Sequence, residues 1–438
     1  MAALDANIPS DRQRAGMAEA IRHVTQDEMS YLTSISEACW PEPFESAQTK
    51  AMPHFVPATP QDVLVLSLDG QPVSCVAYPR RELMIGETTV HFGSLGYVAT
   101  RTEYQRRGYA SRLMVEAVRD MSERGDHVSG LFSFSFGYYR RFGWEVGGDC
   151  WQLLIFPAEF GWEEFALPTY NGYERVRPFR AADLQGISRL HDAHLQRRGW
   201  GLTRPPAYWE WVAGWLNSEI CLVCAGDNGL EGYLVAEITP RLQLPDEFVF
   251  RRTDDSLWPV DIGPVFHIVE MVAATPTARH ALVGYLARRS QEVAALAYPL
   301  ACRSDLESCG FLVPPARVRL MPSFMFRVIN VAEAVRALVD LPAPEEPFSL
   351  AANDPLGLNV EPLAILPSGG RPEVVTGRRE KHHLEMDIQA FSQMYAGYRS
   401  ACSLWALDRL RTSSERAIDL AAQVFILREP FMGELDLF

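Results

Sequence analysis

The sequence lacks several features that would assign it to a familiar class of protein. It has no apolar run of about eighteen residues, so it predicts no membrane-spanning helix. The stretch from Met1 to Met17 is polar and lacks the apolar core of a signal peptide, so we expect a cytoplasmic protein without a membrane partner. Basic residues are outnumbered by acidic ones, and the net charge of −14 argues against a nucleic-acid partner, because such binding depends on basic contacts to phosphate.

Metal and disulfide signals are also missing. The one close pair of cysteines, Cys221 and Cys224, lies in an apolar, strand-like run, and no second pair follows at zinc spacing. His382 and His383 are neighbours at the start of a strand-like segment, where successive side chains point to opposite faces. We therefore expect core thiols and no metal cofactor.

The acidic balance leaves two interpretations open. An acidic cleft would raise the local concentration of a cationic substrate such as a polyamine. The same charge could serve only solubility. Composition does not decide between them.

One segment carries more information than any other, the strand, loop and helix that run from Tyr97 to Glu123. Residues 97–99 are a strand end, and the loop Gln105–Ala110 opens a helix. The first N–H groups of a helix lack intrahelical partners and the helix dipole is positive there, so this loop predicts a pyrophosphate site. Gly108 lets the backbone approach the phosphates, and Ala110 keeps the first turn small. The helix has an apolar stripe at 3.6-residue spacing, formed by Leu113, Met114, Ala117, Val118 and Met121. No GxGxxG or GxxxxGK[ST] loop competes for this role.

The length suggests two to three domains. In the first, Asp62–Gly70 and Pro72–Tyr78 predict a hairpin through Asp69 and Gly70, and Leu83–Tyr97 supplies further strands. After the loop and its helix, Leu131–Ser135 predicts a strand, and a short helix with Tyr138 and Tyr139 follows.

The order of elements then repeats. Predicted strands at 174–178, 219–224, 232–237 and 266–272 are followed by a helix at 278–294 and a strand near 298–302. The loop at 273–280 has no glycine-based phosphate pattern. We expect a degenerate duplicate that cannot hold pyrophosphate and instead shapes the acceptor site.

A third unit begins near residue 328. Residues 328–338 predict a strand end and a helix, and 348–360 a strand segment. The block 383–398, with 408–410, resembles the small sterol-carrier-like fold. Lipid binding is therefore a hypothesis of a different class, although helices that cover the sheet would leave no tunnel. The predicted segments are a flexible extension (1–20), a catalytic domain (21–165), a degenerate domain (166–327) and a sterol-carrier-like domain (328–438).

The Gln105–Ala110 loop resembles the Gln/Arg-x-x-Gly-x-Gly/Ala acyl-CoA signature of the GNAT superfamily of N-acetyltransferases. Taken alone, two arginines and a glycine could simply start a solvated helix. With the duplicate and the third unit, the chain resembles the enhanced intracellular survival family. The fold class so implied is α/β (α+β), with tandem GNAT-like mixed sheets and flanking helices followed by a sterol-carrier-like α+β domain. The family uses acetyl-CoA to acetylate amines of aminoglycosides, polyamine-like compounds or lysines, and assembles as homo-hexamers.

The resemblance also implies roles for individual residues. Those expected to bind acetyl-CoA are Tyr97, Val98, Ala99, Thr100, Gln105, Arg106, Arg107, Gly108, Tyr109 and Ala110. The backbone N–H of Val98 or Thr100 would polarise the thioester carbonyl. Tyr139 would protonate the leaving thiolate, while Tyr138 would fill the aromatic core. Gln105 stands where many relatives have arginine, which removes one charge but keeps a donor.

A base is harder to identify. The family places the terminal carboxylate in the active site, so the resemblance implies this role for Phe438. An α-carboxyl with a pKa of about 3.5 is a poor base and needs burial, Glu434 or Asp436 nearby, or a water relay. It could instead hold the cationic amine, or the apolar end could simply dock.

Acceptor contacts are expected in the first helix and loop, at Glu37, Trp40, Phe44 and Glu45. Aromatic walls with carboxylates suit a polyamine, although an amphipathic helix would explain the same residues. Two further functions stay open: a protein lysine acetyltransferase, and a non-catalytic lipid-binding or scaffold protein.

Overall fold

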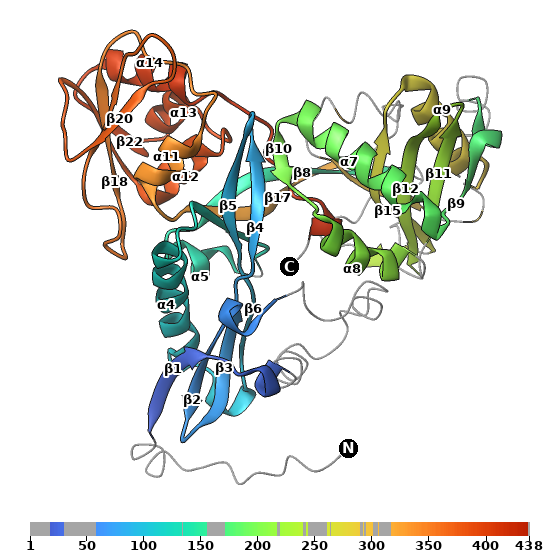
Figure 1. Cartoon of the computed structure of the whole chain (residues 1–438), viewed down its shortest axis with the longest axis horizontal. Coiled ribbons are helices and arrows are strands. Elements are labelled where there is room, and N and C mark those ends of the chain that lie inside the picture. The colour runs from blue at the N-terminus through green and yellow to red at the C-terminus, as the bar shows by residue number, and fades with distance from the viewer. Residues whose placement is uncertain are drawn as a thin grey trace, which may run out of the picture.

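The computed structural model describes residues 18–29, 58–133, 135–155, 171–216, 220–239, 242–243, 261–262, 264–289, 292, 295–300, 305 and 317–436. These form three lobes around a shared centre (Figure 1). The catalytic half predicted from the sequence is the blue lobe, the degenerate half the green and yellow lobe, and the third unit the orange and red lobe. The helices in the described part of the chain all fall short of the length and apolarity that crossing a bilayer requires.

The N-terminal half begins with a small sheet in the order β1-β2-β3-β6. Its strands are β1 (Glu19–His23), β2 (Val63–Leu68), β3 (Gln71–Ala77) and β6 (Gly96–Thr100). The predicted hairpin between β2 and β3 is confirmed, and Asp69 (φ 46°) and Gly70 (φ 80°) both take the left-handed conformation that a tight turn of this kind requires. Helix α4 (Tyr109–Glu123) packs on this sheet through its predicted apolar stripe, which is wholly buried.

A second sheet of 11 described strands runs through both halves of the molecule, in the order β10-β4-β5-β7-β17-β8-β16-β15-β12-β11-β9. Its strands are β4 (Arg80–Ile85), β5 (Thr88–Ser94), β7 (Val128–Leu131), β8 (Glu145–Ile155), β9 (Val176–Pro178), β10 (Trp200–Leu202), β11 (Ile220–Gly226), β12 (Gly229–Thr239), β15 (Val265–Ala273), β16 (Ala295–Leu300) and β17 (Arg317–Val328). The short strands β13 (Leu242–Gln243) and β14 (Asp261–Ile262) pair with each other apart from it.

Two long strands in the centre of this sheet are shared between the halves. β17 follows the second half in the chain, yet it lies between β7 and β8 of the first half. β8 belongs to the first half, yet its residues 151–155 pair with β16 of the second. The predicted domain boundaries stay a prediction, and the sheet itself runs across the first two units without a break.

Helices cover both faces of the second half. These are α7 (Leu184–Arg198), α8 (Pro206–Leu216) and α9 (Pro276–Arg288). Because side chains alternate along a strand, Leu234 and Ala236 of β12 pack in the cluster with α9, while Tyr233 and Val235 pack in the cluster with α7 and α8. Cys221 and Cys224 of β11 are both buried, as expected of core thiols.

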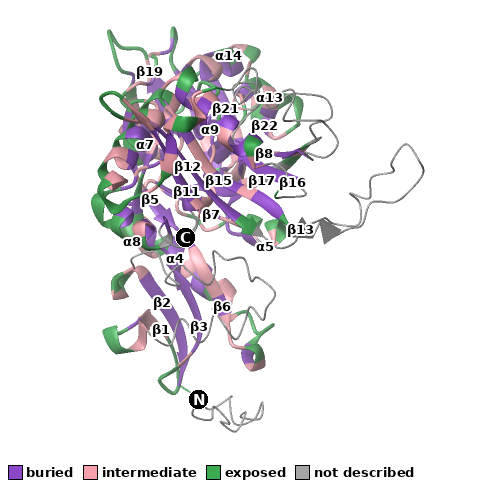
Figure 2. Cartoon of the chain, turned by 90° about the vertical axis from the view of Figure 1, so that its right-hand side faces the viewer, coloured by how far each residue is buried: buried purple, intermediate pink, exposed green. Residues whose placement is uncertain are grey.

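The third lobe is a five-stranded sheet covered by helices. Its elements are α11 (Val331–Ala337), β18 (Phe348–Asn353), β19 (Leu363–Leu366), β20 (Glu373–Thr376), β21 (His382–Asp387), α12 (Ile388–Tyr395), α13 (Ala401–Ala406), β22 (Leu410–Thr412) and α14 (Glu415–Val424). α12 also packs on β17, where Tyr395 stacks on Phe326 with ring centroids 6.4 Å apart. One core thus joins this lobe to the central sheet, and Figure 2 shows exposed residues gathered mainly in peripheral helices and loops.

Three predicted elements have the wrong limits. The strand expected at 131–135 is β7, which begins at Val128 because residues 128–130 pair with β5. The helix expected to reach residue 294 ends at Arg288, and residues 295–300 form β16 instead. The strand expected at 348–360 ends at Asn353, where the Asp354 carboxylate accepts hydrogen bonds from Arg327 and Asn359 and turns the chain away.

Candidate active site

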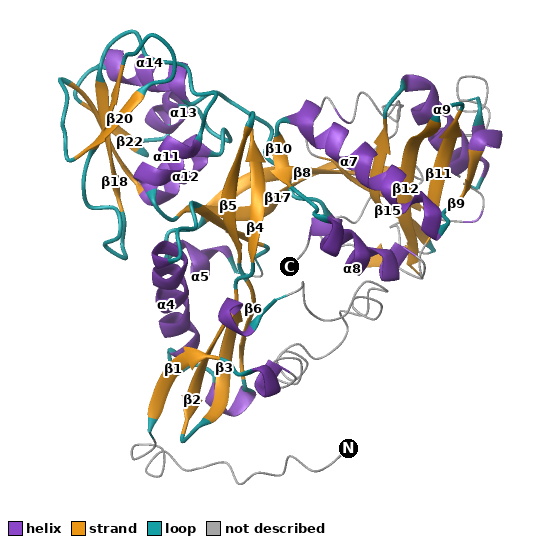
Figure 3. Cartoon of the chain, in the orientation of Figure 1, coloured by secondary structure: helices purple, strands orange, loops and turns teal. Residues whose placement is uncertain are grey.

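A cleft opens in the N-terminal half where two parallel strands part. β5 and β7 pair through residues 92–94 and 128–130, and the backbone N–H of Leu95 still donates to the Gly130 carbonyl oxygen (2.9 Å). Beyond this point β6 turns to pair with β3, whereas Leu131 pairs with Met325 of β17. The strand that follows α4 (the purple helix so labelled in Figure 3) therefore splays from its neighbour.

The predicted carbonyl-binding residues lie on β6 at the side of this cleft. Tyr97 has a positive φ of 51°, and the register with β3 shifts between Gly96, which pairs with Ala77, and Ala99, which pairs with Cys75. Ala99 is buried and Thr100 is half-buried, with its hydroxyl 2.8 Å from that of Ser74. The bulge at Tyr97 and Val98 interrupts the ladder and changes the direction of the backbone at the side of the cleft.

The predicted phosphate loop has the backbone shape of an anion site. Arg106 (φ 60°) and Gly108 (φ 80°) are both left-handed, and Gly108 is the N-cap of α4, where no side chain caps the helix. Alternation of this kind turns successive N–H groups toward one concavity. Residues 105–108 are exposed, whereas Tyr109 and Ala110 are half-buried in the first turn. The Gln105 side chain donates to the Thr100 carbonyl oxygen (3.1 Å).

The equivalent helix of the second half begins differently. α9 has Thr275 as its N-cap, and the Thr275 hydroxyl accepts the hydrogen bond of the Ala278 N–H (3.1 Å). Pro276 in the first turn has no N–H to offer. Of the four backbone N–H groups at the start of a helix that could bind an anion, one is therefore hydrogen-bonded to Thr275 and another is missing at Pro276. This supports the prediction that the second half cannot hold pyrophosphate.

Tyr139 lies on α5 (Phe136–Arg140), the helix that follows β7 in the sequence. It is only 2% exposed and packs in the same apolar cluster as the α4 stripe. Tyr138 meets it edge-on, with ring centroids 5.0 Å apart, and is half-buried. Tyr138 packs against the aromatic core, as expected, and Tyr139 is the more deeply buried of the two. Burial, with a smaller effect of Tyr138, raises the pKa of Tyr139, so its hydroxyl is protonated at neutral pH.

Five predicted site residues lie outside the described residues: Glu37, Trp40, Phe44, Glu45 and Phe438. Their roles stay predictions.

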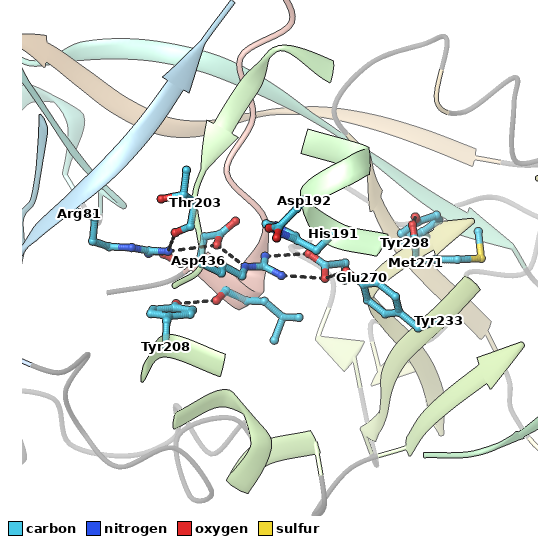
Figure 4. Close-up of polar contacts among 12 residues, drawn as sticks. Arg81, His191, Asp192, Thr203, Tyr208, Tyr233, Glu270, Met271, Tyr298 and Asp436 are labelled. Carbon is cyan, nitrogen blue, oxygen red and sulfur yellow. Dashed lines mark hydrogen bonds and ion pairs between the residues drawn. The ribbon is translucent and has the colours of Figure 1, made fainter. Parts of the chain in front are cut away.

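The structure also brings together a charge cluster that the sequence did not predict (Figure 4). Arg204, just after β10, donates to both carboxylate oxygens of Glu270 on β15 (2.9 and 2.8 Å). Its Nε atom donates to Oδ1 of Asp436 (2.8 Å), in the turn Glu434–Asp436 near the end of the chain. Arg81 of β4 reaches the same Oδ1 atom (3.4 Å). These residues come from four distant segments, and the sole sequence signal is an acidic Glu270 inside an apolar strand.

Asp436 is buried in this cluster, and the side chain of Glu270 is only 16% exposed. Burial by itself would raise the pKa of Glu270 and of Asp436, but the Arg204 guanidinium outweighs it and holds both pKa values below the ordinary range. Tyr233 adds a hydrogen bond to Glu270 (2.6 Å). Both carboxyl groups are therefore ionised at neutral pH, and each forms an ion pair with Arg204.

A cavity of about 270 Å³ lies beside this cluster, in the second half. There β15 and β16 pair through residues 265–267 and 295–297 and then part, just as β5 and β7 do. Tyr298 bridges the divergence, since its hydroxyl donates to the Met271 carbonyl oxygen (3.3 Å). The cavity is lined by α7, by β15 and by residues of the segment Phe431–Asp436. The second half thus keeps the cleft although its helix is capped.

Comparison with known proteins accounts for all three lobes. Acetyltransferase (GNAT) domains match at residues 20–147 and again at 201–328, and a sterol carrier protein domain matches at 331–433. Two acetyltransferase (GNAT) domains followed by a sterol carrier protein domain are the organisation that the resemblance to the enhanced intracellular survival family implied. It is an acetyl-CoA-dependent N-acetyltransferase. An uncharacterized N-acetyltransferase from Streptomyces griseus is 23% identical over 80% of this chain and 84% of its own length.

Solved structures show the same fold in other proteins. A GCN5-related N-acetyltransferase from Anabaena variabilis (19% identity, TM-score 0.75) covers 96% of this chain and 100% of its own. A probable N-acyltransferase from Enterococcus faecalis (21%, TM-score 0.75) has the same coverage, and Eis1 from Mycobacterium abscessus (17%, TM-score 0.65) covers 95% and 99%.

Proposed function

We propose that this enzyme transfers the acetyl group of acetyl-CoA to a primary amine of a cationic acceptor, by direct attack of the amine on the thioester. The observation that carries this proposal is the difference between the two helix N-termini. α4 begins at an uncapped Gly108 beside a splayed cleft, whereas α9 is capped by Thr275. Of the two halves, the first therefore has N–H groups available for the pyrophosphate.

The bound acetyl-CoA supplies an activated acyl group, so the protein needs no nucleophile of its own. The loop Arg106–Ala110 would hold the pyrophosphate, and the cleft between β6 and β7 would hold the pantetheine arm. The bulge at Tyr97 and Val98 interrupts the pairing of β6 with β3. The N–H of Val98 would donate to the thioester carbonyl oxygen, where negative charge develops during the reaction.

Tyr139 would donate a proton to the departing thiolate. Its raised pKa keeps the hydroxyl protonated and excludes a basic role near neutral pH. The same shift makes the phenol a weaker acid, so its position beside the thiolate matters more than its acidity. For the base we propose the terminal carboxylate of Phe438, after the resemblance. Adding one residue after Phe438 tests this role, since turnover should fall if the carboxylate acts and stay unchanged if it does not.

The charge of the chain supports a cationic acceptor. The net charge of −14 favours a cationic acceptor, such as an aminoglycoside or a polyamine-like compound. A lysine side chain of a protein is the alternative. Glu37, Trp40, Phe44 and Glu45 would line its binding site.

The deciding experiment is the rate of free thiol release from acetyl-CoA by the purified protein, with aminoglycosides, polyamines and a lysine peptide offered in turn. Release that depends on one amine class supports the proposal and identifies the acceptor class. Release with the peptide alone favours the protein acceptor. If no amine supports release, the proposed reaction is wrong.

A further inference from the structure

The last described segment, Phe431–Asp436, passes across the molecule and is held by both GNAT halves. The Met432 carbonyl oxygen lies 3.4 Å from the Ser323 hydroxyl of β17, and Glu434 forms an ion pair with His267 of β15 (2.8 Å). Leu435 packs in the apolar cluster of α8, and its carbonyl oxygen accepts from the Tyr208 hydroxyl (2.7 Å). The segment therefore lies on the second half, at the mouth of its cavity.

Asp436 then connects this segment to the first half. Arg81 of β4 donates to the Asp436 carbonyl oxygen (3.1 Å) as well as to its carboxylate. In the pairing of β4 with β5, Arg81 stands opposite Phe92, and β5 ends at Ser94, one residue before the catalytic cleft begins at Leu95. The segment thus ends close to the cleft that would hold the thioester.

Arg204 holds Asp436 in this position through an ion pair. The side chains of Arg204 and Asp436 are 1% and 9% exposed, so water cannot replace the contacts between them. The two carboxylates of Glu270 and Asp436 are balanced by the guanidinium groups of Arg204 and Arg81. A buried cluster of this kind is stable only when each member has its partner. Without Arg204, Glu270 would lose its cation and Asp436 would keep only the longer contact with Arg81 (3.4 Å), so the two carboxylates would repel each other and Asp436 would be displaced.

We infer that Arg204 is a positioning residue of the acetyl-transfer reaction, which acts by holding the segment Phe431–Asp436 against the catalytic half. The inference rests on the proposed function and adds a role to the half that cannot bind pyrophosphate. That half keeps its cleft because the cleft receives this segment. Arg204 does not touch the reacting atoms, so its effect reaches the reaction through Asp436.

The test compares Arg204→Met with Arg204→Lys and Asp436→Asn. Hydrogen exchange of a peptide that covers residues 431–436 measures the hold on the segment without reference to activity. We expect about tenfold faster exchange in Arg204→Met, and a turnover number lower by about 10- to 100-fold with little change in the KM for acetyl-CoA, as expected for a displaced group. Arg204→Lys keeps the charge and should recover part of both losses.

Two controls separate positioning from general damage. Glu231→Gln breaks the Arg175–Glu231 ion pair (3.0 Å) elsewhere in the second half and should leave both exchange and turnover unchanged. Asp436→Asn keeps the size of the side chain and tests the same contact if Arg204→Met fails to fold. In the double variant, Arg204→Met should add little to the turnover loss of Asp436→Asn, because both act through one contact.

The inference is overturned if exchange of the 431–436 peptide is the same in the wild type and in the Arg204 and Asp436 variants. It is equally overturned if exchange accelerates while turnover stays unchanged. If the wild-type enzyme acetylates no amine, the proposed function fails, and the exchange measurement still decides whether Arg204 holds the segment.

Discussion

Tyr139 combines deep burial with a hydroxyl that stays protonated. We predict that Tyr139→Phe lowers the turnover number by about 10²-fold, the usual effect of losing a proton donor, with little change in acetyl-CoA affinity. Thiol release under saturating acetyl-CoA measures the first quantity and isothermal titration the second. The phenyl ring keeps most of the packing, so the fold should survive.

Its neighbour provides the matched control. Tyr138 stacks edge-on against Tyr139 and is half-buried. Tyr138→Phe should leave turnover within about twofold of the wild type, well below the effect expected for a proton donor. Equal losses in both variants would remove Tyr139 from the reaction and leave it a packing role.

Arg327 is the most deeply buried arginine among the described residues that form ion pairs, and it joins three units of the chain. Its guanidinium donates to the Phe142 carbonyl oxygen (2.5 Å) in the first half and to Asp354 (2.8 Å) in the third lobe, with neither charged side chain exposed. Arg327→Met leaves the Asp354 carboxylate buried without its partner, so we predict a loss of about 3–5 kcal/mol in the free energy of unfolding. Urea unfolding of the wild type and of Arg327→Met measures this difference in the free energy of unfolding.

The double variant Arg327→Met with Asp354→Asn removes both charges and should recover a substantial part of that loss. A single variant as stable as the wild type would show that the pair contributes little.

At the scale of whole elements, the two ends of α4 offer a matched comparison. Gly108 (φ 80°) precedes the helix and Gly125 (φ 79°) follows it, and a Cβ at either position would meet no atom within 4 Å. Alanine at either site should therefore cost the same backbone strain, about 1–2 kcal/mol. We predict that only Gly108→Ala also weakens acetyl-CoA binding, by about tenfold, because only that end would hold the pyrophosphate in the proposed site.

Calorimetric titration with acetyl-CoA checks the affinity, and thermal unfolding checks the equal strain. Equal affinity in Gly108→Ala and Gly125→Ala would contradict the placement of the pyrophosphate.

The ion pair between His267 of β15 and Glu434 makes the stability of the folded protein depend on pH. Burial lowers the pKa of His267, but the charge and hydrogen bond of Glu434, with a smaller effect of Glu237, outweigh it and raise the pKa overall. A raised histidine pKa stabilises the folded state fully below the unfolded value of about 6.5, and this contribution is lost as pH rises through the folded value.

We therefore predict that the melting temperature falls between pH 6 and pH 9 and that His267→Gln reduces this fall. Thermal unfolding of both proteins across that range provides the measurement. The same slope in both proteins would assign the pH dependence to other groups.

Elements were predictable wherever their signal is local. The α4 stripe from Leu113 to Met121 shows its period within one helix, and the hairpin turn is visible at Asp69 and Gly70. The limits of β7 and β18 were missed because they depend on partners: pairing with β5 sets the first, and the Arg327–Asp354 contact ends the second. Arg204, Glu270 and Asp436 are far apart in sequence, so no spacing could reveal their cluster.

At the scale of the whole molecule, the third lobe acts as a support. Gln389 of α12 donates to the Arg140 carbonyl oxygen (2.9 Å), and Gln393 donates to that of Val146 (2.9 Å). These contacts lie on both sides of the turn that follows Tyr139. The interior of the lobe is filled by buried apolar side chains of α12, α13 and α14, which favours the packing role over the lipid-binding one.

The homo-hexamer implied by the resemblance stays a prediction. Sedimentation velocity at micromolar concentration would show a single species of about six chains of 49.2 kDa each. A monomer under the same conditions would contradict it.

The sharing of β17 has a consequence for synthesis of the chain. A ribosome makes the N-terminal half first, and a nascent domain generally folds as soon as its residues have emerged. Here the strand between β7 and β8 comes from residues 317–328, so the catalytic sheet stays incomplete until the whole second half has been translated. The nascent chain therefore completes the cleft between β6 and β7 late, and a polypeptide released early would carry α4 and the loop before it without the strand that supports β7.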